Sequence, residues 1–293
     1  MESKNEIKSE SGINYYVIAV IFISALFFVV ANAFEPQINT QLDFFELVFI
    51  LGMFAPAVFS FIIARRYWPS PVFGKAYLSL GLAYALTAIG AIIFDYYQIV
   101  EKIENPYPSI ADVFFMAFYP FAIYHLRTNI HFIRRVQKPE LKKSQIMLLI
   151  VIPLGVAAFY TFGLLYQPVF HDVGIPDEST SLNLVPRIFT QMTFDSINNM
   201  DLHTAGFYLG IVFVAATSLT FAWAIIGAQV FRGSSLGAPW GMLLVGIAMN
   251  TIADVSYYYT SISSYDRSNP IIGMWILGDM LVCYALYLHK KQL

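Results

Sequence analysis

Eight long apolar runs divide this chain, and short polar segments separate them. Each run has the roughly 20 mostly apolar residues that a helix needs to cross a bilayer core about 30 Å thick. Strand-like alternation is absent and backbone groups must be paired within hydrocarbon, so the runs predict helices rather than barrel strands. We therefore predict an all-α integral membrane protein with eight transmembrane helices, at about 14–34, 44–66, 76–99, 110–128, 145–166, 204–231, 237–260 and 271–289.

The positions of the positive charges predict the orientation of these helices. If the N-terminus is cytoplasmic, every lysine and arginine falls in an inner segment except Lys102, Arg187 and Arg267. Cytoplasmic segments of membrane proteins carry such an excess of Lys and Arg. We therefore expect a multi-pass protein of the cell (plasma) membrane, surrounded by lipid bilayer, with both termini in the cytoplasm.

The first run allows a second interpretation. Ala31-Asn32-Ala33 follows an apolar stretch and resembles the cleavage site of a signal peptide. The first ten residues, however, carry three glutamates and two lysines, so the positively charged start of a signal peptide is missing. We predict that the run stays in the protein as a helix, and cleavage remains the alternative.

The chain repeats itself in the order of its landmarks. When the two halves are aligned without gaps from Gly74 and Gly233, Asp95 falls on Asp254. Each half then has an outer Asn-Pro pair and a last helix that carries an aspartate, which is Asp112 in the first half and Asp279 in the second. Four helices followed by four keep the same orientation, which predicts two parallel four-helix repeats about an axis near the membrane normal.

This organisation predicts the division of the chain. A basic cytoplasmic loop either lies against anionic lipid headgroups or serves only to set the topology. An outer loop in the second repeat has the length of a functional segment. The predicted parts are a cytoplasmic tail over 1–13, a first repeat over 14–128, the basic loop over 129–144, a second repeat over 145–289 with the outer loop at 167–203, and a cytoplasmic tail over 290–293.

Composition supports the membrane assignment and excludes several other classes. Hydrophobic residues make up 58% of the chain and charged residues only 12%, about half the charged share of a soluble domain. The net charge of −2 and the short basic clusters argue against a nucleic-acid partner. The single cysteine, Cys283, excludes an intrachain disulfide and a CxxC zinc site.

Four aspartates are the main candidates for function, since an acidic residue at membrane depth costs about 2.5–3.5 kcal/mol on insertion scales. In the functional interpretation, Asp95, Asp112, Asp254 and Asp279 line an outward-facing cavity for a cation, a proton or a polar ligand. In the structural interpretation, Asp112 accepts backbone N–H bonds at a helix start, and Asp95 and Asp254 accept tyrosine hydroxyls. We favour the structural role for Asp112 and the functional role for the deeper Asp279.

Asn250 lies one turn before Asp254 and joins the predicted cavity, with a plain interhelical hydrogen bond as the alternative. In the outer loop, His171, Asp172 and His203 are weak candidates for binding Zn²⁺ or Cu²⁺, because their spacing matches no metal motif. No metal site is therefore predicted.

Motifs of catalysis are missing from the sequence. It contains no Gly-x-Ser-x-Gly, no HExxH and no glycine-rich phosphate loop, so we predict no catalytic residue and no cofactor. His125, His131 and His289 lie beside cationic residues, where we expect them at the level of the inner headgroups.

The segment from Asn105 to Pro120, which reads NPYPSIADVFFMAFYP, carries a resemblance. It resembles the multi-span membrane sensor regions that precede diguanylate cyclase or phosphodiesterase domains in bacterial signalling proteins, with their Pro-Ser-x-Ala-Asp motif. The resemblance covers residues 65–128 and, more weakly, 225–290. It implies a sensory or ligand-binding module, and because no output domain follows here, signalling would need a protein partner.

These observations lead to three candidate functions. The first is a non-enzymatic membrane sensor that binds a ligand in the aspartate cavity and signals through a cytoplasmic or membrane protein partner. The second is a secondary transporter that uses the intramembrane carboxylates. The third is an accessory subunit of a larger membrane complex.

Overall fold

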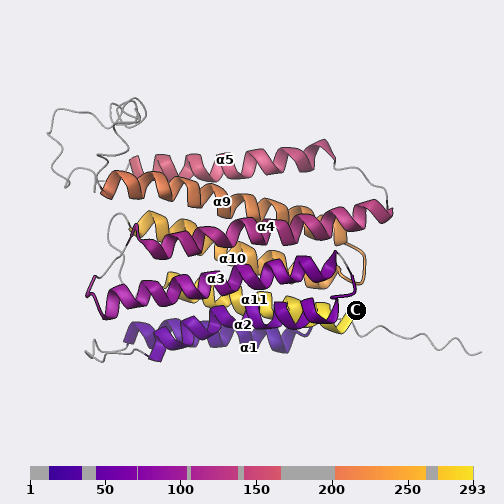
Figure 1. Cartoon of the computed structure of the whole chain (residues 1–293), viewed down its shortest axis with the longest axis horizontal. Helices are drawn as coiled ribbons and strands as arrows, with labels where there is room; N and C mark the ends of the chain where they lie inside the picture. The colour runs from indigo at the N-terminus through magenta and orange to yellow at the C-terminus, as the bar shows by residue number, and fades with distance from the viewer. Residues whose placement is uncertain are drawn as a thin grey trace, which may run out of the picture.

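The computed structural model describes residues 13–34, 44–70, 72–103, 107–137, 142–165, 202–261 and 270–292. Within these ranges all regular structure is helical, and the helices lie side by side along one direction (Figure 1). There are eight of them in the described residues: α1 (Tyr15–Phe34), α2 (Phe44–Arg66), α3 (Phe73–Ile99), α4 (Ile110–Gln137), α5 (Lys143–Leu165), α9 (Leu202–Phe231), α10 (Gly237–Ser261) and α11 (Ile271–Gln292).

Six of these helices are long and apolar enough to cross a membrane: α2, α3, α5, α9, α10 and α11. The chain is therefore a helical, multi-pass membrane protein, as its composition predicts. The remaining two are α1, whose apolar part is shorter, and α4, which has 28 residues but carries arginines in its second half. The number of eight spans stays a prediction.

Helix α4 extends further than the hydropathy pattern predicts. The predicted span ends at residue 128 and the predicted loop covers 129–144, yet the helix continues to Gln137. Asn129 bonds back to the His125 carbonyl at 2.9 Å, and Ile130 is completely buried. A hydropathy average along the sequence detects the part of a helix that lipid surrounds. The part of α4 after residue 128 is instead stabilised by packing against the bundle.

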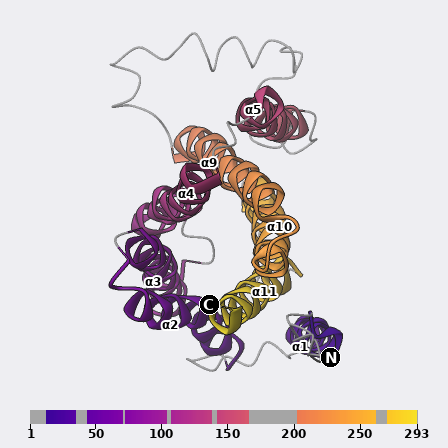
Figure 2. The ribbon, with the colours of Figure 1, turned by 90° about the vertical axis from the view of Figure 1, so that its right-hand side faces the viewer.

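Six helices form a closed ring. Each of α2, α3, α4, α9, α10 and α11 contacts the next in this order, and α11 closes on α2 (Figure 2). The other two lie outside the ring, α1 against α11 and α5 against α9. Apolar side chains such as Phe27 and Phe159 stand exposed on these outer helices, as lipid-facing residues do.

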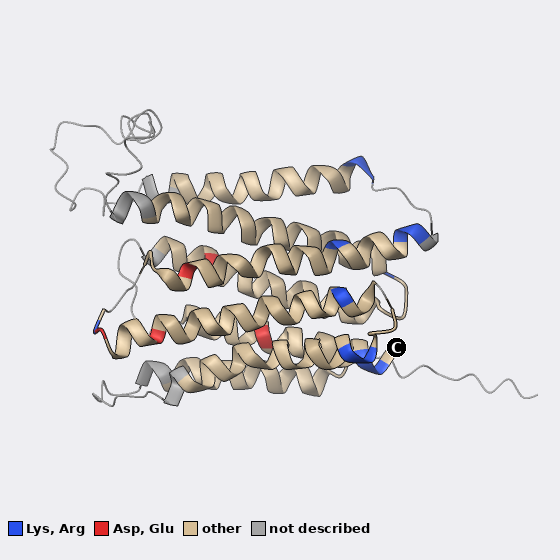
Figure 3. Ribbon diagram, in the orientation of Figure 1, with Lys and Arg blue, Asp and Glu red and all other residues tan. Residues whose placement is uncertain are grey.

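Charged side chains are separated along the helix direction. Lysines and arginines of the described residues gather at one end of the bundle, apart from Lys102 beyond the end of α3, and the acidic residues lie away from that end (Figure 3). The backbone N–H of Asn14 donates to the Tyr284 hydroxyl at 2.8 Å. The start of α1 therefore lies beside the C-terminal half of α11.

Candidate functional site

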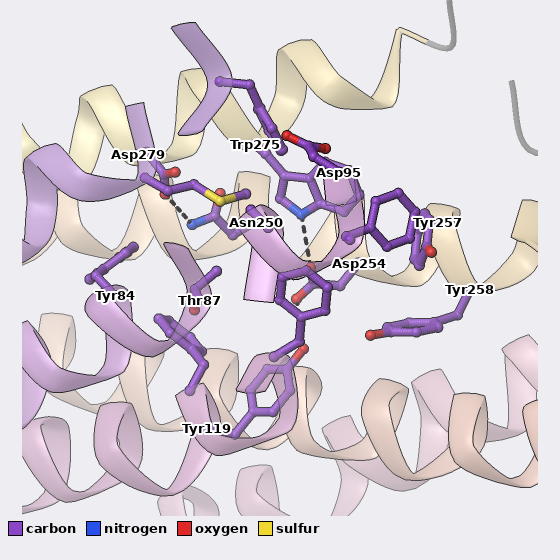
Figure 4. Close-up of a pocket in the computed structure, with 16 residues that line it drawn as sticks. Tyr84, Thr87, Asp95, Tyr119, Asn250, Asp254, Tyr257, Tyr258, Trp275 and Asp279 are labelled. Atoms are coloured by element: carbon purple, nitrogen blue, oxygen red, sulfur yellow. Dashed lines mark hydrogen bonds between the residues drawn. The ribbon is translucent and has the colours of Figure 1, made fainter. Parts of the chain in front are cut away.

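A cavity of about 110 Å³ lies inside the ring, between α2, α3, α4, α10 and α11 (Figure 4). None of its 16 lining residues is a lysine or an arginine. Most of the wall is aromatic and is contributed by Phe49, Tyr84, Phe94, Phe115, Phe118, Tyr119, Tyr257, Tyr258 and Trp275.

Four of the five residues predicted for a ligand cavity line this one. Asp95 comes from α3, Asn250 and Asp254 from α10, and Asp279 from α11. Residues that are far apart in sequence, in both predicted halves, therefore meet around a single space.

Asp112, the fifth predicted residue, does not line the cavity. Its Oδ2 accepts the backbone N–H of Ser109 at 2.6 Å, and the Ser109 hydroxyl accepts the N–H of Ala111 at 3.2 Å. This reciprocal arrangement is a capping box at the start of α4. The inclusion of Asp112 among the cavity residues is thus corrected, because this carboxylate satisfies the backbone donors of a helix end.

Asp254 has its negative charge balanced by three donors from three other helices. Trp275 Nε1 donates to Oδ1 at 2.8 Å, and the hydroxyls of Thr217 and Tyr119 donate to Oδ2 at 2.8 and 3.0 Å. The donors come from α11, α9 and α4. Since both carboxylate oxygens are engaged, Asp254 ties the ring together and has little capacity left for a ligand.

Asp279 is in a different situation. It is only 5% exposed, and among the described residues its carboxylate accepts one side-chain hydrogen bond, from Asn250 Nδ2 to Oδ1 at 3.1 Å. Removing a carboxylate from water without a positive partner is expensive. Within the described residues, Asp279 is therefore a buried carboxylate that no positively charged side chain neutralises.

Gly278 gives Asn250 the space to reach Asp279. A Cβ at position 278 would collide with the amide oxygen of Asn250, and a Cβ at Gly246 would lie 2.8 Å from the Gly278 carbonyl oxygen. The close crossing of α10 and α11 therefore positions the amide that holds the buried carboxylate.

The aromatic walls are packed against one another at defined angles. Tyr84 and Phe118 meet edge to face with ring centroids 5.2 Å apart, and Trp275 lies 5.6 Å from Tyr257. Aromatic faces attract cations through the negative charge of their π-electrons. The cavity thus combines carboxylates with aromatic surfaces, which is the chemistry that recognises a positive charge.

Tyr107, which lies shortly before the start of α4, is held beside the cavity by contacts with other helices. Its hydroxyl donates to the Gly206 carbonyl at 2.6 Å, and its ring contacts the cavity residues Tyr257 and Tyr258 at 6.3 and 5.5 Å. The segment that carries the Pro-Ser-x-Ala-Asp motif is in this way attached to α9 and α10.

The weak metal candidates cannot be placed. His171 and Asp172 lie outside the described residues, as does the side chain of His203. Within the part of the chain that the structure describes, no group of three or more His, Cys, Asp or Glu side chains could hold a metal ion.

Two of the histidines expected at the headgroup level are buried between the helices. His125 is 1% exposed and His289 is 5% exposed, so both are inside the bundle. The expectation relied on neighbouring cations in sequence, but the helical turn directs those cations outward and the histidines inward.

We did not predict from the sequence that aromatic side chains form most of the cavity wall. A signal was present: Trp275 precedes Asp279 by four residues, which places both on one face of α11. The partnership of Tyr119 with Asp254 joins positions 135 residues apart, and no local pattern indicates it.

In comparisons with models of protein families, with curated proteins and with solved structures, the chain matches none.

Proposed function

We propose that this protein is a non-enzymatic membrane module that binds a small organic cation in the cavity inside the ring, between α2, α3, α4, α10 and α11. The observation that carries the proposal is Asp279, a buried carboxylate on the wall of an aromatic cavity that has, among the described residues, one amide donor and no positive partner. A cation supplies the missing countercharge, and the aromatic faces favour an ammonium group over a hydrated metal ion.

The volume of the cavity limits the size of this ligand. An engineered apolar cavity of about 150 Å³ takes up one benzene molecule, and the cavity here measures about 110 Å³. We therefore expect a cation of roughly five heavy atoms, of the size of tetramethylammonium. A larger cation enters only if its remainder extends out through the mouth.

The proposed role of binding is sensing. A ligand that contacts Asp279 on α11 and the aromatic residues on α3 and α4 bridges helices from both halves of the chain, so its presence favours one arrangement of the ring. The resemblance of residues 105–120 to sensor regions supports the same role. A protein partner at the basic end of the bundle would receive the signal.

We further propose that all eight helices cross the membrane as two parallel repeats, with both termini in the cytoplasm. Three features support this: the ring order α2-α3-α4 followed by α9-α10-α11, the concentration of lysine and arginine at one end, and the contact of Asn14 with Tyr284. Helices α1 and α5, which lie outside the ring, pack against different partners, α11 and α9. The support for the repeat therefore comes mainly from the six helices of the ring.

Secondary transport of the same cation is the second candidate. It is favoured by the position of the cavity on the axis of a ring built from two helix triplets, where transporters with repeats bind their substrates. Uptake of the cation into liposomes that contain the protein separates the candidates, because a sensor binds without net flux.

The test of cation binding is a calorimetric titration of the purified full chain with tetramethylammonium. We expect Asp279→Asn to weaken binding at least about tenfold, since the variant keeps the shape and removes the countercharge. Asp112→Asn is the matched control: it changes a carboxylate on α4 that lies outside the cavity, and we expect it to leave the affinity unchanged. Equal affinities of wild type and Asp279→Asn would contradict the proposal.

A further inference from the structure

A second set of rings fills the inside of the bundle toward its basic end. This inner cluster consists of Tyr77 on α3, His125 on α4, Trp240 on α10 and His289 on α11. Each side chain comes from a different helix of the ring, and all four are buried. None of them lines the cation cavity.

The rings of the inner cluster contact one another directly. The centroid of Tyr77 lies 4.9 Å from that of His125 and 5.2 Å from that of His289. Trp240 is nearly parallel to His125, at an angle of 12° and a centroid distance of 6.4 Å. Phe231 of α9 stacks on the indole at 4.3 Å, so the four rings close the inside of the bundle here.

Both histidines retain unused hydrogen-bonding capacity. His125 Nδ1 lies 2.9 Å from the Ala76 carbonyl, which makes it a donor and leaves Nε2 as the basic nitrogen of a neutral ring. His289 Nδ1 is buried and has no hydrogen-bond partner among the described residues. A space of about 10 Å³ beside the rings, also lined by Leu243 and Leu286, has about the size of one water molecule.

No negative charge is available to hold a proton on these rings. The titratable side chain that faces His125 and His289 is Tyr77, and the ring centroid of Tyr67 lies 6.4 Å from that of Tyr77. The rings that α9 and α10 place against the cluster, Phe231 and Trp240, do not titrate. Among the side chains that the structure describes, no aspartate or glutamate lies at this end (Figure 3). The charged groups there are positive, and all but the half-buried Arg134 are exposed: Arg65, Arg66, Lys75, Arg127, Arg134, Arg135, Lys142, Lys143, Arg232, Lys290 and Lys291.

We propose that His125 and His289 form a proton-binding site whose occupation opens the basic end of the bundle. While both rings are neutral, they pack against Tyr77 and Trp240 and the end is closed. An imidazolium in this place would be a buried charge without a partner, so it is stable only when water surrounds it and the cluster has separated.

The sign of the pH dependence follows from this linkage. The open state binds more protons than the closed state, so falling pH favours the open state and rising pH favours the closed state. This proposal does not depend on cation binding in the cavity that contains Asp279, because the inner cluster consists of different side chains.

Thiol labelling measures this opening. In a chain with Cys283→Ser, the variant Leu286→Cys places one thiol on the wall of the inner cluster, at a position that is 3% exposed. Ser235→Cys, at an exposed position between α9 and α10, is the matched control for the effect of pH on the thiol itself. The reaction rate with a hydrophilic maleimide is measured for both on the full chain in detergent micelles, and the ratio of the two rates is compared at different pH values.

We expect the rate ratio of Leu286→Cys to Ser235→Cys to rise about tenfold between pH 7.5 and pH 5.5, the range in which histidine titrates. The rise should disappear when His125→Gln and His289→Gln are added. A ratio that stays constant with both histidines present, or that rises equally without them, would overturn the proposal. If Leu286→Cys does not fold, Leu243→Cys probes the same space from α10, and His289→Gln alone replaces a double variant that does not fold.

Discussion

At the scale of the residue, the half-buried Asp254 and the buried Asp279 of the cavity differ in how their carboxylates are hydrogen-bonded. Asp254 receives three donors and Asp279 receives one. Their sequence contexts are alike, since each follows apolar residues in a long helix. The difference arises from side chains on other helices, and it is the reason why we propose a structural role for Asp254 and a ligand contact for Asp279.

The structural role of Asp254 leads to a prediction for its indole donor. Trp275→Phe keeps an aromatic face in the cavity but removes the N–H that donates to Asp254 at 2.8 Å. A lost hydrogen bond to a buried charged group is worth about 1.5–3 kcal/mol, so we expect the thermal unfolding midpoint to fall by several degrees. Trp68→Phe, at a position that is 63% exposed, is the control and should have little effect. Equal midpoints for the two variants would show that the bond contributes no stability.

At the scale of the element, the crossing of α10 and α11 places Asn250 against Asp279. Gly246→Ala brings a methyl group within 2.8 Å of the Gly278 carbonyl oxygen and of Val282, whereas Gly241→Ala on the same helix meets nothing within 4 Å. In the helix interior alanine is favoured over glycine by about 1 kcal/mol. We therefore expect Gly246→Ala to lower the unfolding midpoint and Gly241→Ala to leave it unchanged or raise it. The opposite order would mean that the crossing is not close.

The elements themselves were largely predictable from the sequence, because a run of apolar residues is the physical requirement for a membrane helix. The predictions failed where packing between helices, rather than contact with lipid, determines the structure. Helix α4 continues to Gln137 because Ile130 is packed in the core, and lipid hydropathy does not measure that. His125 and His289 turn inward although their neighbours in sequence are cations. The aspartates of the cavity were found by their cost in a membrane, but their partners depend on tertiary contacts such as Tyr119 with Asp254.

At the scale of the whole molecule, the proposed topology places the basic end of the bundle in the cytoplasm. Glu101 lies just beyond the end of α3, and Ser235 lies between α9 and α10 near Arg232. In a chain with Cys283→Ser, we expect Glu101→Cys to react with an impermeant thiol reagent added to intact cells, and Ser235→Cys to react only after permeabilisation. Labelling of Ser235→Cys alone in intact cells would reverse the orientation.

Along the helix direction, the bundle has two chemically different regions, the aspartate-containing cavity and the inner cluster toward the basic end. Carboxylates and aromatic rings surround the proposed cation cavity, and the buried rings of His125 and His289 lie toward the basic end. The two are joined by helices α3, α4, α10 and α11, which contribute residues to both. The proposed sensing requires that these shared helices transmit ligand binding to the basic end of the bundle.

The account depends most directly on recognition of positive charge, and one pair of ligands measures it. Tetramethylammonium and tert-butanol each have five heavy atoms and nearly the same shape, but only the first is a cation. Calorimetric titration of the full chain should give at least about a hundredfold higher affinity for tetramethylammonium, since a desolvated cation–π contact and a buried countercharge each contribute on the order of 2 kcal/mol. Equal affinities would mean that the cavity selects by shape alone, and Asp279 would not be the site of a cation.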